Sequence, residues 1–313
     1  MPLSDATFEK FAQLLLDKVG IVLPPSRKRM LVNRIISRVR AHGMRSFDQY
    51  YDLVANGNDF YEWQKLIDRV TTHYTSFFRE NNHFLHLRSL LVNRFKKGIL
   101  RARIWSSACS TGEEVYSIAI TVLEAMKEAN VRYVDVRILG TDVALEPLQV
   151  ADRGFYSEAS INDLSPDLRA YFELIPGTSG LNDERLFRVQ SRVRELVIFR
   201  LVNLCEHPLT VPNEIDVIFC RNVLLYFNKE RQLQILTAIG QKLIAGGTLY
   251  VGTSEHVRGM LPEMICSAPS VYSKKEFLNQ QHNDYVKYVP RVFLDAGELN
   301  SPGLSTLSPR TPG

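Results

Sequence analysis

The chain has 313 residues, of which 45% are hydrophobic and 23% charged, and its formal net charge is +4. This balance is typical of a soluble globular protein, and the length allows two domains, or one domain with an appendage. The charge is too mild to indicate nucleic-acid binding by itself. No apolar stretch approaches the ~20 residues that span a bilayer, and residues 1–10 lack a signal-peptide pattern. We therefore expect a cytoplasmic protein with no membrane insertion.

The cysteines give no indication of a disulfide framework or a metal site. No two of them form a CxxC pair, and most sit in or beside apolar runs. This pattern predicts free, reduced thiols and no bound metal. The four are Cys109, Cys205, Cys220 and Cys266.

Residues 1–72 are predicted to form an all-helical domain. Ser4 or Asp5 can cap a first helix that Gly20 ends. A second helix is expected to begin at Ser26, after a Pro-Pro pair, and to end at His42. Two shorter helices are expected over residues 47–55 and 59–70. The apolar faces of the first two helices comprise Phe8, Phe11, Leu15 and Val19, and Leu31, Ile35 and Val39.

From about residue 100 the pattern alternates between strands and helices, which predicts an α/β fold with a doubly wound parallel sheet. Gly246-Gly247 is expected to end the last helix before its strand. The expected strands are 102–107, 134–140, 217–220 and 248–252, and the expected helices are 114–129, 145–152 and 229–244.

Residues 157–200 interrupt this alternation and predict a small antiparallel β insertion. The segment contains a short helix over 165–172, a Gly-Thr-Ser-Gly turn, and two strand-like runs at 186–189 and 195–199. Residues 281–313 are interpreted as a disordered tail, since their end is rich in Ser, Pro and Gly.

Small residues join the first strand to its helix, and such a turn lets a ligand approach the backbone amides at the carboxyl edge of a sheet. Only Gly112 is glycine, so the GxGxxG dinucleotide fingerprint is missing and a plain capped turn remains an alternative. Asp142 ends the second strand, where a carboxylate can accept hydrogen bonds from ribose hydroxyls. The alternative is that Asp142 caps the next helix.

Four blocks, in order and at matching spacing, resemble the chemotaxis receptor methyltransferases, the CheR family. They are Thr71 to Glu80, Trp105 to Ser117, Asp216 to Phe227 and Gly252 to Glu255. The resemblance implies a Rossmann-like class I methyltransferase domain at 73–280. It also implies the cofactor S-adenosyl-L-methionine, with S-adenosyl-L-homocysteine as product, and methylation of glutamates on methyl-accepting chemotaxis receptors.

The resemblance also implies which residues surround the cofactor. The family usually has Asn where this chain has His73, whose ring nitrogen would then have to supply the contact. Asn203 and Leu204 would lie on the adenine side, and Asp142 would hold the ribose. The full set is His73, Thr75, Arg79, Ala108, Gly112, Glu114, Asp142, Asn203, Leu204, Arg221 and Asn222.

Two residues are predicted to act on the acceptor. A glutamate carboxylate, with a pKa near ~4.3, is ionised at neutral pH and needs no general base. The guanidinium of Arg79 can bind and orient it bidentately. The ring of Tyr226 can contact the sulfonium methyl by a cation–π interaction, or can be a core aromatic instead.

No acidic residue lies between Asp17 and Asp48, and the basic residues there predict a docking surface for acidic receptor helices. A solvated basic face and nucleic-acid binding are the alternatives. The resemblance also implies that the insertion is a candidate second contact, through strand addition of a receptor's C-terminal peptide. The competing function is a catalytically weak cofactor-binding regulator, and a monomer is expected. The docking residues that share one helix face are Arg27, Arg34 and Arg38.

Overall fold

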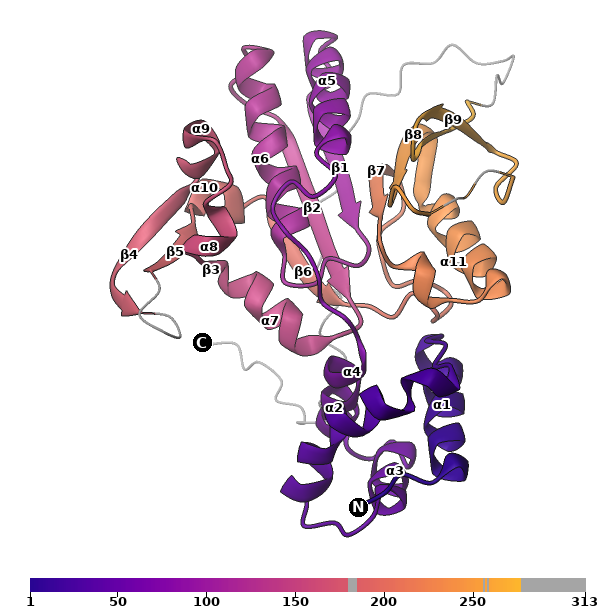
Figure 1. Cartoon of the computed structure of the whole chain (residues 1–313). Helices are drawn as coiled ribbons and strands as arrows, with labels where there is room; N and C mark the ends of the chain where they lie inside the picture. The colour runs from indigo at the N-terminus through magenta and orange to yellow at the C-terminus, as the bar shows by residue number, and fades with distance from the viewer. Residues whose placement is uncertain (180–184, 256, 258, 277–313) are drawn as a thin grey trace, which may run out of the picture. The chain divides into compact units, whose positions relative to one another are not determined.

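The structure is a computed structural model that describes residues 1–179, 185–255, 257 and 259–276. These residues all belong to one compact unit, Met1–Glu276. The tail predicted at 281–313 lies outside the described residues. Figure 1 shows the N-terminal helices below a mixed sheet, with a separate small sheet to the left of it. The fold class predicted from the sequence is confirmed.

The N-terminal helices form as their capping residues and apolar spacing predict. The Ser4 hydroxyl accepts a hydrogen bond from the Thr7 amide at 3.0 Å, and Gly20 ends the first helix with φ +73°. Ser26, expected to cap the second helix, lies instead inside a 3-10 turn, so that helix begins at Lys28 without a side-chain cap. The elements are α1 (Asp5–Val19), η1 (Pro25–Arg27), α2 (Lys28–Ala41), α3 (Phe47–Ala55) and α4 (Phe60–Val70).

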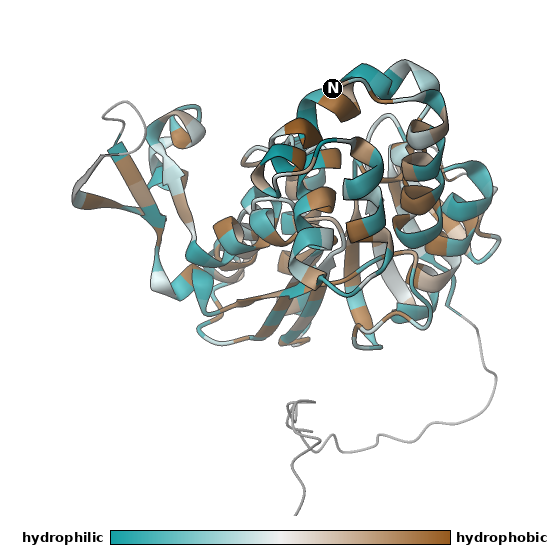
Figure 2. Cartoon of the chain, turned by 90° about the horizontal axis from the view of Figure 1, so that it is seen from below, coloured by the Kyte–Doolittle hydropathy of each residue, from teal (hydrophilic) through white to brown (hydrophobic). Residues whose placement is uncertain are grey.

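These helices are amphipathic, and Figure 2 shows hydrophobic and hydrophilic residues alternating along those near the N-terminus. Their apolar faces enclose a core of their own that includes Phe11, Leu15, Leu31, Ile35 and Val39, all fully buried. Burying each such side chain contributes roughly 1.5–3 kcal/mol.

The main sheet has seven strands in the order β6-β2-β1-β7-β8-β10-β9. The first five run parallel, and β10 pairs antiparallel with both β8 and β9. The strands are β1 (Arg101–Ser106), β2 (Asp135–Asp142), β6 (Val197–Leu201), β7 (Ile215–Cys220), β8 (Leu243–Val251), β9 (Met264–Ala268) and β10 (Val271–Lys274).

Alternate residues of the central strands face opposite cores, as a doubly wound sheet requires. Ile104 and Phe219 belong to the core shared with α5 (Asn82–Lys96) and α6 (Glu113–Glu128). Trp105 belongs to the core shared with α11 (Lys229–Lys242). The helix α5 was not predicted from the sequence, although its buried face repeats at helical spacing. Its buried residues are His83, Phe84, Leu87, Leu91, Val92 and Phe95.

The insertion is a three-stranded antiparallel sheet in the order β3-β5-β4. The run 195–199, predicted to belong to it, instead forms β6, which pairs with β2 of the main sheet. The predicted helix over 165–172 is shorter, and Gly177 to Ser179 extend a strand instead of forming a turn. The elements are α7 (Leu145–Arg153), β3 (Phe155–Ser157), α8 (Glu158–Ile161), α9 (Pro166–Arg169), β4 (Phe172–Ser179), β5 (Arg185–Val189) and α10 (Ser191–Arg194).

The glycine pair at 246–247 does not end a helix, contrary to the prediction. The helix α11 ends at Lys242, and both glycines lie within β8, where Gly246 has φ +73°. The register between β7 and β8 shifts across this pair, since Ile215 pairs with Leu243 but Val217 pairs with Thr248. The pair therefore accommodates an irregularity in a strand, a second common role of glycine.

Candidate functional site

A cavity of about 450 Å³ lies at the carboxyl ends of β1, β2 and β7. Its walls come from two regions far apart in the sequence: the ends of these strands, and the end of α4 together with the segment that joins α1 to α2. The volume is within the range of small-molecule sites, roughly 300–1,000 Å³. Crevices at this edge of an open α/β sheet are where such folds bind ligands.

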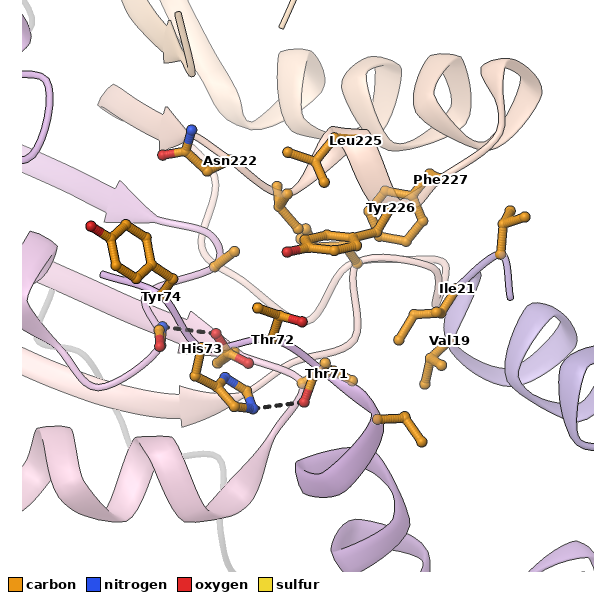
Figure 3. A pocket seen from close by; sticks show the side chains of 18 of the residues that line it. Val19, Ile21, Thr71, Thr72, His73, Tyr74, Asn222, Leu225, Tyr226 and Phe227 are labelled. Atoms are coloured by element: carbon orange, nitrogen blue, oxygen red, sulfur yellow. Dashed lines mark hydrogen bonds between the residues drawn. The ribbon is translucent and has the colours of Figure 1, made fainter. Parts of the chain in front are cut away.

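One wall of the cavity is apolar, and Tyr226 alone among its residues was predicted to lie at the site. It combines Val19 at the end of α1 and Ile21 just after it with Tyr226 and Phe227, which follow β7 (Figure 3). Leu23 also lines the cavity. The two segments are joined by a hydrogen bond from the Val22 amide to the Tyr226 carbonyl, at 3.2 Å. No local pattern indicated this wall, because residues 19–24 read only as the end of one helix and the start of the next.

The loop after β1 supplies polar groups. Ser107, Ala108 and Ser110 line the cavity, and the hydroxyls of both serines are buried with no hydrogen-bond partner among the described residues. Gly112 stands behind this loop with φ +95°, where an added Cβ would lie 2.7 Å from the Cβ of Ala151. Gly112 therefore serves the close packing of the turn and does not itself line the cavity.

Asp142 lines the cavity at the end of β2 and is 8% exposed. Its Oδ2 accepts a hydrogen bond from the Ser110 amide at 2.8 Å, and its Oδ1 accepts one from the Ala144 amide at 3.0 Å. The carboxylate thus ties together the loops that follow β1 and β2. Burial raises its pKa, and the backbone amides work against that shift. An ionised carboxylate has about four acceptor positions, so the three backbone amides of Ser110, Val143 and Ala144 leave at least one for a ligand hydroxyl.

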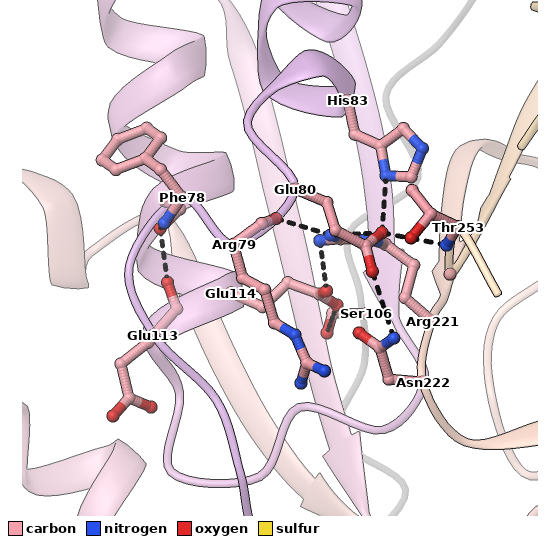
Figure 4. Close-up of polar contacts among 12 residues, drawn as sticks. Phe78, Arg79, Glu80, His83, Ser106, Glu113, Glu114, Arg221, Asn222 and Thr253 are labelled. Atoms are coloured by element: carbon pink, nitrogen blue, oxygen red, sulfur yellow. Dashed lines mark hydrogen bonds and ion pairs between the residues drawn. The ribbon is translucent and has the colours of Figure 1, made fainter. Parts of the chain in front are cut away.

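Arg221 is the centre of a buried charge network (Figure 4). Its side chain is 1% exposed and lies 2.9 Å from Glu114 and 3.0 Å from Glu80, and it also donates to the Arg79 carbonyl at 2.5 Å. The Ser106 hydroxyl donates to Glu114 at 2.7 Å. Burial raises the pKa of Glu114, against the opposing effect of Arg221. Arg221 therefore favours the ionised form of both carboxylates, of which Glu114 lines the cavity.

Arg79 lies on a constrained loop. The residues on either side of it, Phe78 and Glu80, have φ of 54° and 56°, which is uncommon for residues other than glycine. The Phe78 amide donates to the Ser117 hydroxyl at 2.9 Å, which fixes one end of the loop. The Arg79 guanidinium donates to the Tyr74 carbonyl at 2.7 Å and lies over the Tyr74 ring. It makes no ion pair within the described part of the chain.

The structure brings most of the other predicted cofactor residues to the same cavity. His73 lines it and lies 2.6 Å from the Thr71 hydroxyl, through Nε2. The amide of Asn203 is already engaged, since it donates to the Lys18 carbonyl at 2.7 Å and accepts from the Cys205 amide. Tyr226 is half-buried with its ring in the cavity wall. The remaining lining residues of the predicted set are Thr75, Leu204 and Asn222.

The three predicted docking residues differ in how far their guanidinium groups are bonded within the protein. Arg27 is exposed and lies at the cavity. Arg34 is directed at the carbonyls that end α4, the nearest at 2.8 Å. Arg38 forms an ion pair with Glu62, which also accepts a hydrogen bond from the Tyr50 hydroxyl at 2.7 Å. Two of the three guanidinium groups are therefore engaged within the helical domain itself.

Two carboxylates at the site were not predicted, although both stand inside the quoted blocks. Glu80 accepts from the Asn222 side chain at 3.2 Å and from the Thr253 amide at 3.2 Å, in addition to Arg221. Glu255 accepts from the amides of Asn222, Leu224 and Gly252 at 2.7–2.8 Å. These glutamates hold the loops that follow β7 and β8. Their role could not be predicted, because it depends on contacts between segments far apart in the sequence.

Within the described residues, no group of three His, Cys, Asp or Glu side chains could hold a metal ion. In the same part of the chain, no helix has the length and apolar character needed to cross a membrane. All four cysteines are free thiols.

Comparison with known proteins defines the class of this site. Residues 73–271 match the family model described as "CheR methyltransferase, SAM binding domain", and residues 6–71 match "CheR methyltransferase, all-alpha domain". The fold and the cavity are thus those of an S-adenosylmethionine-dependent methyltransferase, which makes the protein an enzyme.

The names of curated relatives agree with this family match. A "Chemotaxis protein methyltransferase" of Salmonella typhimurium is 36% identical over 274 residues, covering 87% of this chain and 91% of the relative. The protein of that name from Escherichia coli is 35% identical, over 87% of this chain and 92% of the relative. A "Probable chemotaxis protein methyltransferase" of Rhizobium etli is 36% identical, over 79% and 91%. The chain belongs to the CheR methyltransferase family.

The cavity fits this cofactor in chemical terms. S-adenosylmethionine carries an ammonium group and ribose hydroxyls, which need acceptors, and the cavity offers the carboxylates of Glu114 and Asp142. Its methionine carboxylate needs donors, and the unpartnered hydroxyls of Ser107 and Ser110 belong to residues that line the same space. Apolar side chains, including Leu204 and Phe227, supply surfaces against which an adenine can pack.

Proposed function

We propose that the protein transfers the methyl group of S-adenosylmethionine to glutamate side chains of methyl-accepting chemotaxis receptors and so forms glutamyl methyl esters. The observation that carries the proposal is the contrast between Arg79 and Arg221, two of the three arginines that line the cavity. Arg221 is buried and paired with Glu80 and Glu114, whereas Arg79 reaches the cavity with no carboxylate partner among the described residues. Arg79 is therefore a cation available to bind an incoming carboxylate beside the strand ends, while Arg27, the third arginine, belongs to the proposed docking face on the helical domain.

Glu114 and Asp142 are proposed to hold the polar groups of the cofactor, with Asn203 and Leu204 on its adenine side and His73, Thr75, Ala108 and Asn222 completing the lining. When bound, S-adenosylmethionine supplies a methyl group activated by its sulfonium charge. The His73 ring nitrogen already faces Thr71, so its remaining ring nitrogen is the one available to a ligand. Gly112 contributes indirectly, by letting the turn pack against α7.

The protein's own residues then have to orient the receptor carboxylate relative to the methyl group. The receptor carboxylate is ionised at neutral pH, with a pKa near ~4.3, so no general base is needed. Arg79 fixes the angle of that carboxylate through two parallel hydrogen bonds. Tyr226 presents its ring to the reacting centre, where a cation–π contact stabilises positive charge. Holding the acceptor in a productive geometry is worth a large part of the barrier, roughly 7–11 kcal/mol for well-oriented groups.

The basic face of α2 is proposed to dock the acidic helices of the receptor, with Arg27 nearest the cavity. Arg34 and Arg38 add positive charge to that face while they bond within the domain. The antiparallel insertion is a proposed second contact. We propose that the enzyme acts as a monomer in the cytoplasm, which the four free thiols support, and that it does not act on nucleic acid.

The proposal is tested by transfer of radiolabelled methyl from S-adenosylmethionine to receptor-containing membranes, with base-labile methanol scored. We expect base-labile label on a receptor band. In Arg79→Ala, kcat is expected to fall ~100-fold or more, while the Kd for S-adenosylmethionine changes much less.

The matched control is Arg132→Ala, which removes an exposed arginine that lies before β2 and makes no side-chain hydrogen bond or ion pair with the described residues. It should retain wild-type turnover. Wild-type protein that binds the cofactor but labels no receptor would overturn the proposed reaction. Equal losses of turnover and cofactor affinity in Arg79→Ala would remove the catalytic role of Arg79.

A further inference from the structure

The side chain of Arg34 reaches from the middle of α2 to the carboxyl end of α4. Its Nη1 lies 3.1 Å from the carbonyl oxygen of Arg69, 2.9 Å from that of Val70 and 2.8 Å from that of Thr71. The last carbonyls of a helix lack partners within the helix and carry its partial negative charge. A guanidinium at this place therefore caps α4, and only tertiary structure can supply it.

The end of α4 leads directly into the cofactor cavity. Val70 and the five residues that follow it all line the cavity, and the family boundary between the helical domain and the cofactor-binding domain falls here, between residues 71 and 73. Thr71 leaves the helix in an extended conformation, and its hydroxyl contacts both the Ile67 carbonyl and the His73 ring, each at 2.6 Å. Figure 3 shows this segment passing from the helix into the pocket wall.

The opposite side of α4 is held by the methyltransferase domain. Asp68 accepts a hydrogen bond from the Glu146 amide at the start of α7, at 3.1 Å, and Lys65 forms an ion pair with the Glu146 carboxylate. Arg34 on one side and Glu146 on the other thus fix where α4 ends. Because residues 71–75 start from that end, their place in the cavity depends on both contacts.

We propose that Arg34 is a positioning residue for the cofactor site: by capping α4 it sets the loop of residues 71–75 that lines the pocket. The inference rests on the cofactor site of the proposed function and gives Arg34 a role that needs no receptor. A docking role alone would leave cofactor affinity untouched, since the receptor is absent from the measurement. The positioning role predicts that loss of Arg34 lowers cofactor affinity directly.

The test is isothermal calorimetry of S-adenosylmethionine binding to the full-length protein without receptor. For Arg34→Gln we expect the Kd to rise ~10-fold, because a charge-assisted contact to several carbonyls is lost. Arg34→Lys keeps the charge at the helix end but not the planar fork, and we expect a rise of ~3-fold. The matched control is Arg40→Gln on the same helix, whose exposed side chain makes no hydrogen bond or ion pair with the described residues; its Kd should equal that of the wild type.

The inference is overturned if both Arg34 variants bind S-adenosylmethionine like the wild type, even with a lowered Tm, because a purely structural role lowers stability without changing the affinity of the folded protein. An equal loss in Arg40→Gln would also overturn it, since the effect would then be one of general charge. If Arg34→Gln does not fold, Arg34→Lys carries the same test. The proposed reaction fails separately, in wild-type protein that binds the cofactor but methylates no receptor.

Discussion

Glu62 is the buried anion on which the helical domain depends, and replacing it with glutamine gives a sharp test of the structure. Its side chain is 4% exposed. Oε1 accepts hydrogen bonds from Arg38 at 3.0 Å and Tyr50 at 2.7 Å, while Oε2 faces Arg38 and His42, the latter at 3.0 Å. Burial acts to raise the pKa of Glu62, but the hydrogen bonds from Arg38, His42 and Tyr50 outweigh it and lower the pKa from 4.5 to about 2.

The magnitude follows from that difference. A gap of about 2.5 pKa units between the unfolded and folded states corresponds to about 3 kcal/mol of stability at pH 7. The folded pKa is the lower one, so this stability is fully present above the unfolded value of 4.5 and is lost as pH falls toward about 2. Glu62→Gln should therefore destabilise the protein by about 3 kcal/mol at pH 7 and by only about half as much at pH 3.

Urea unfolding of wild type and Glu62→Gln, followed by circular dichroism between pH 7 and pH 3, measures this difference. Comparing the two proteins at each pH cancels the carboxylates they share. These include Asp59, which caps α4 by accepting a hydrogen bond from the amide of residue 62 and is retained in both proteins. A gap that stays constant with pH, or one below ~1 kcal/mol at pH 7, would refute the assignment of Glu62 as an ionised buried partner of Arg38.

Two further substitutions test the walls of the cavity. Gly20→Ala would place a Cβ 2.5 Å from the Cys205 sulfur, in a residue whose φ is +73°. We therefore expect it to lower the free energy of unfolding by roughly 1–3 kcal/mol and to weaken cofactor binding. The control is Gly43→Ala, whose φ is +64° and whose Cβ would have nothing within 4 Å, so it should cost only the backbone strain. Thermal unfolding and calorimetry compare the two, and equal effects would refute the packing argument. Glu255→Gln puts an amide group opposite three backbone N–H donors and should lower stability by roughly 1–3 kcal/mol together with cofactor affinity, as Asn222 loses its support. An unchanged Tm would show that Glu255 does not hold this loop.

Much of the site could be predicted because its residues stand in contiguous blocks. The runs around Thr75, Glu114 and Arg221 each end a strand or precede a helix, and their order along the chain matches one family. Of the predicted cofactor residues, Gly112 alone does not line the cavity. The apolar wall of residues 19–24 could not be predicted, because nothing in that segment indicates that it crosses to the far end of β7.

Structural features that depend only on neighbouring residues could be predicted from the amino-acid sequence alone. The caps of α1, the whole of α3 and four of the strands of the main sheet, β1, β2, β7 and β8, could be predicted in this way, because capping chemistry and apolar runs act over a few residues.

Which distant groups meet depends on tertiary packing. Residues 197–201 alternate as any short strand does, and their pairing with β2 depends on how the insertion folds back. Arg34 and Arg38 read as one basic face on α2, yet the approach of α4 gives them carbonyls and Glu62 as partners. A charged side chain buried beside a partner must pair with it, because leaving either group alone in a low-dielectric interior costs several kcal/mol, roughly 3–5 for a broken pair. The identity of that partner depends on the packing of the helices, which no local pattern encodes.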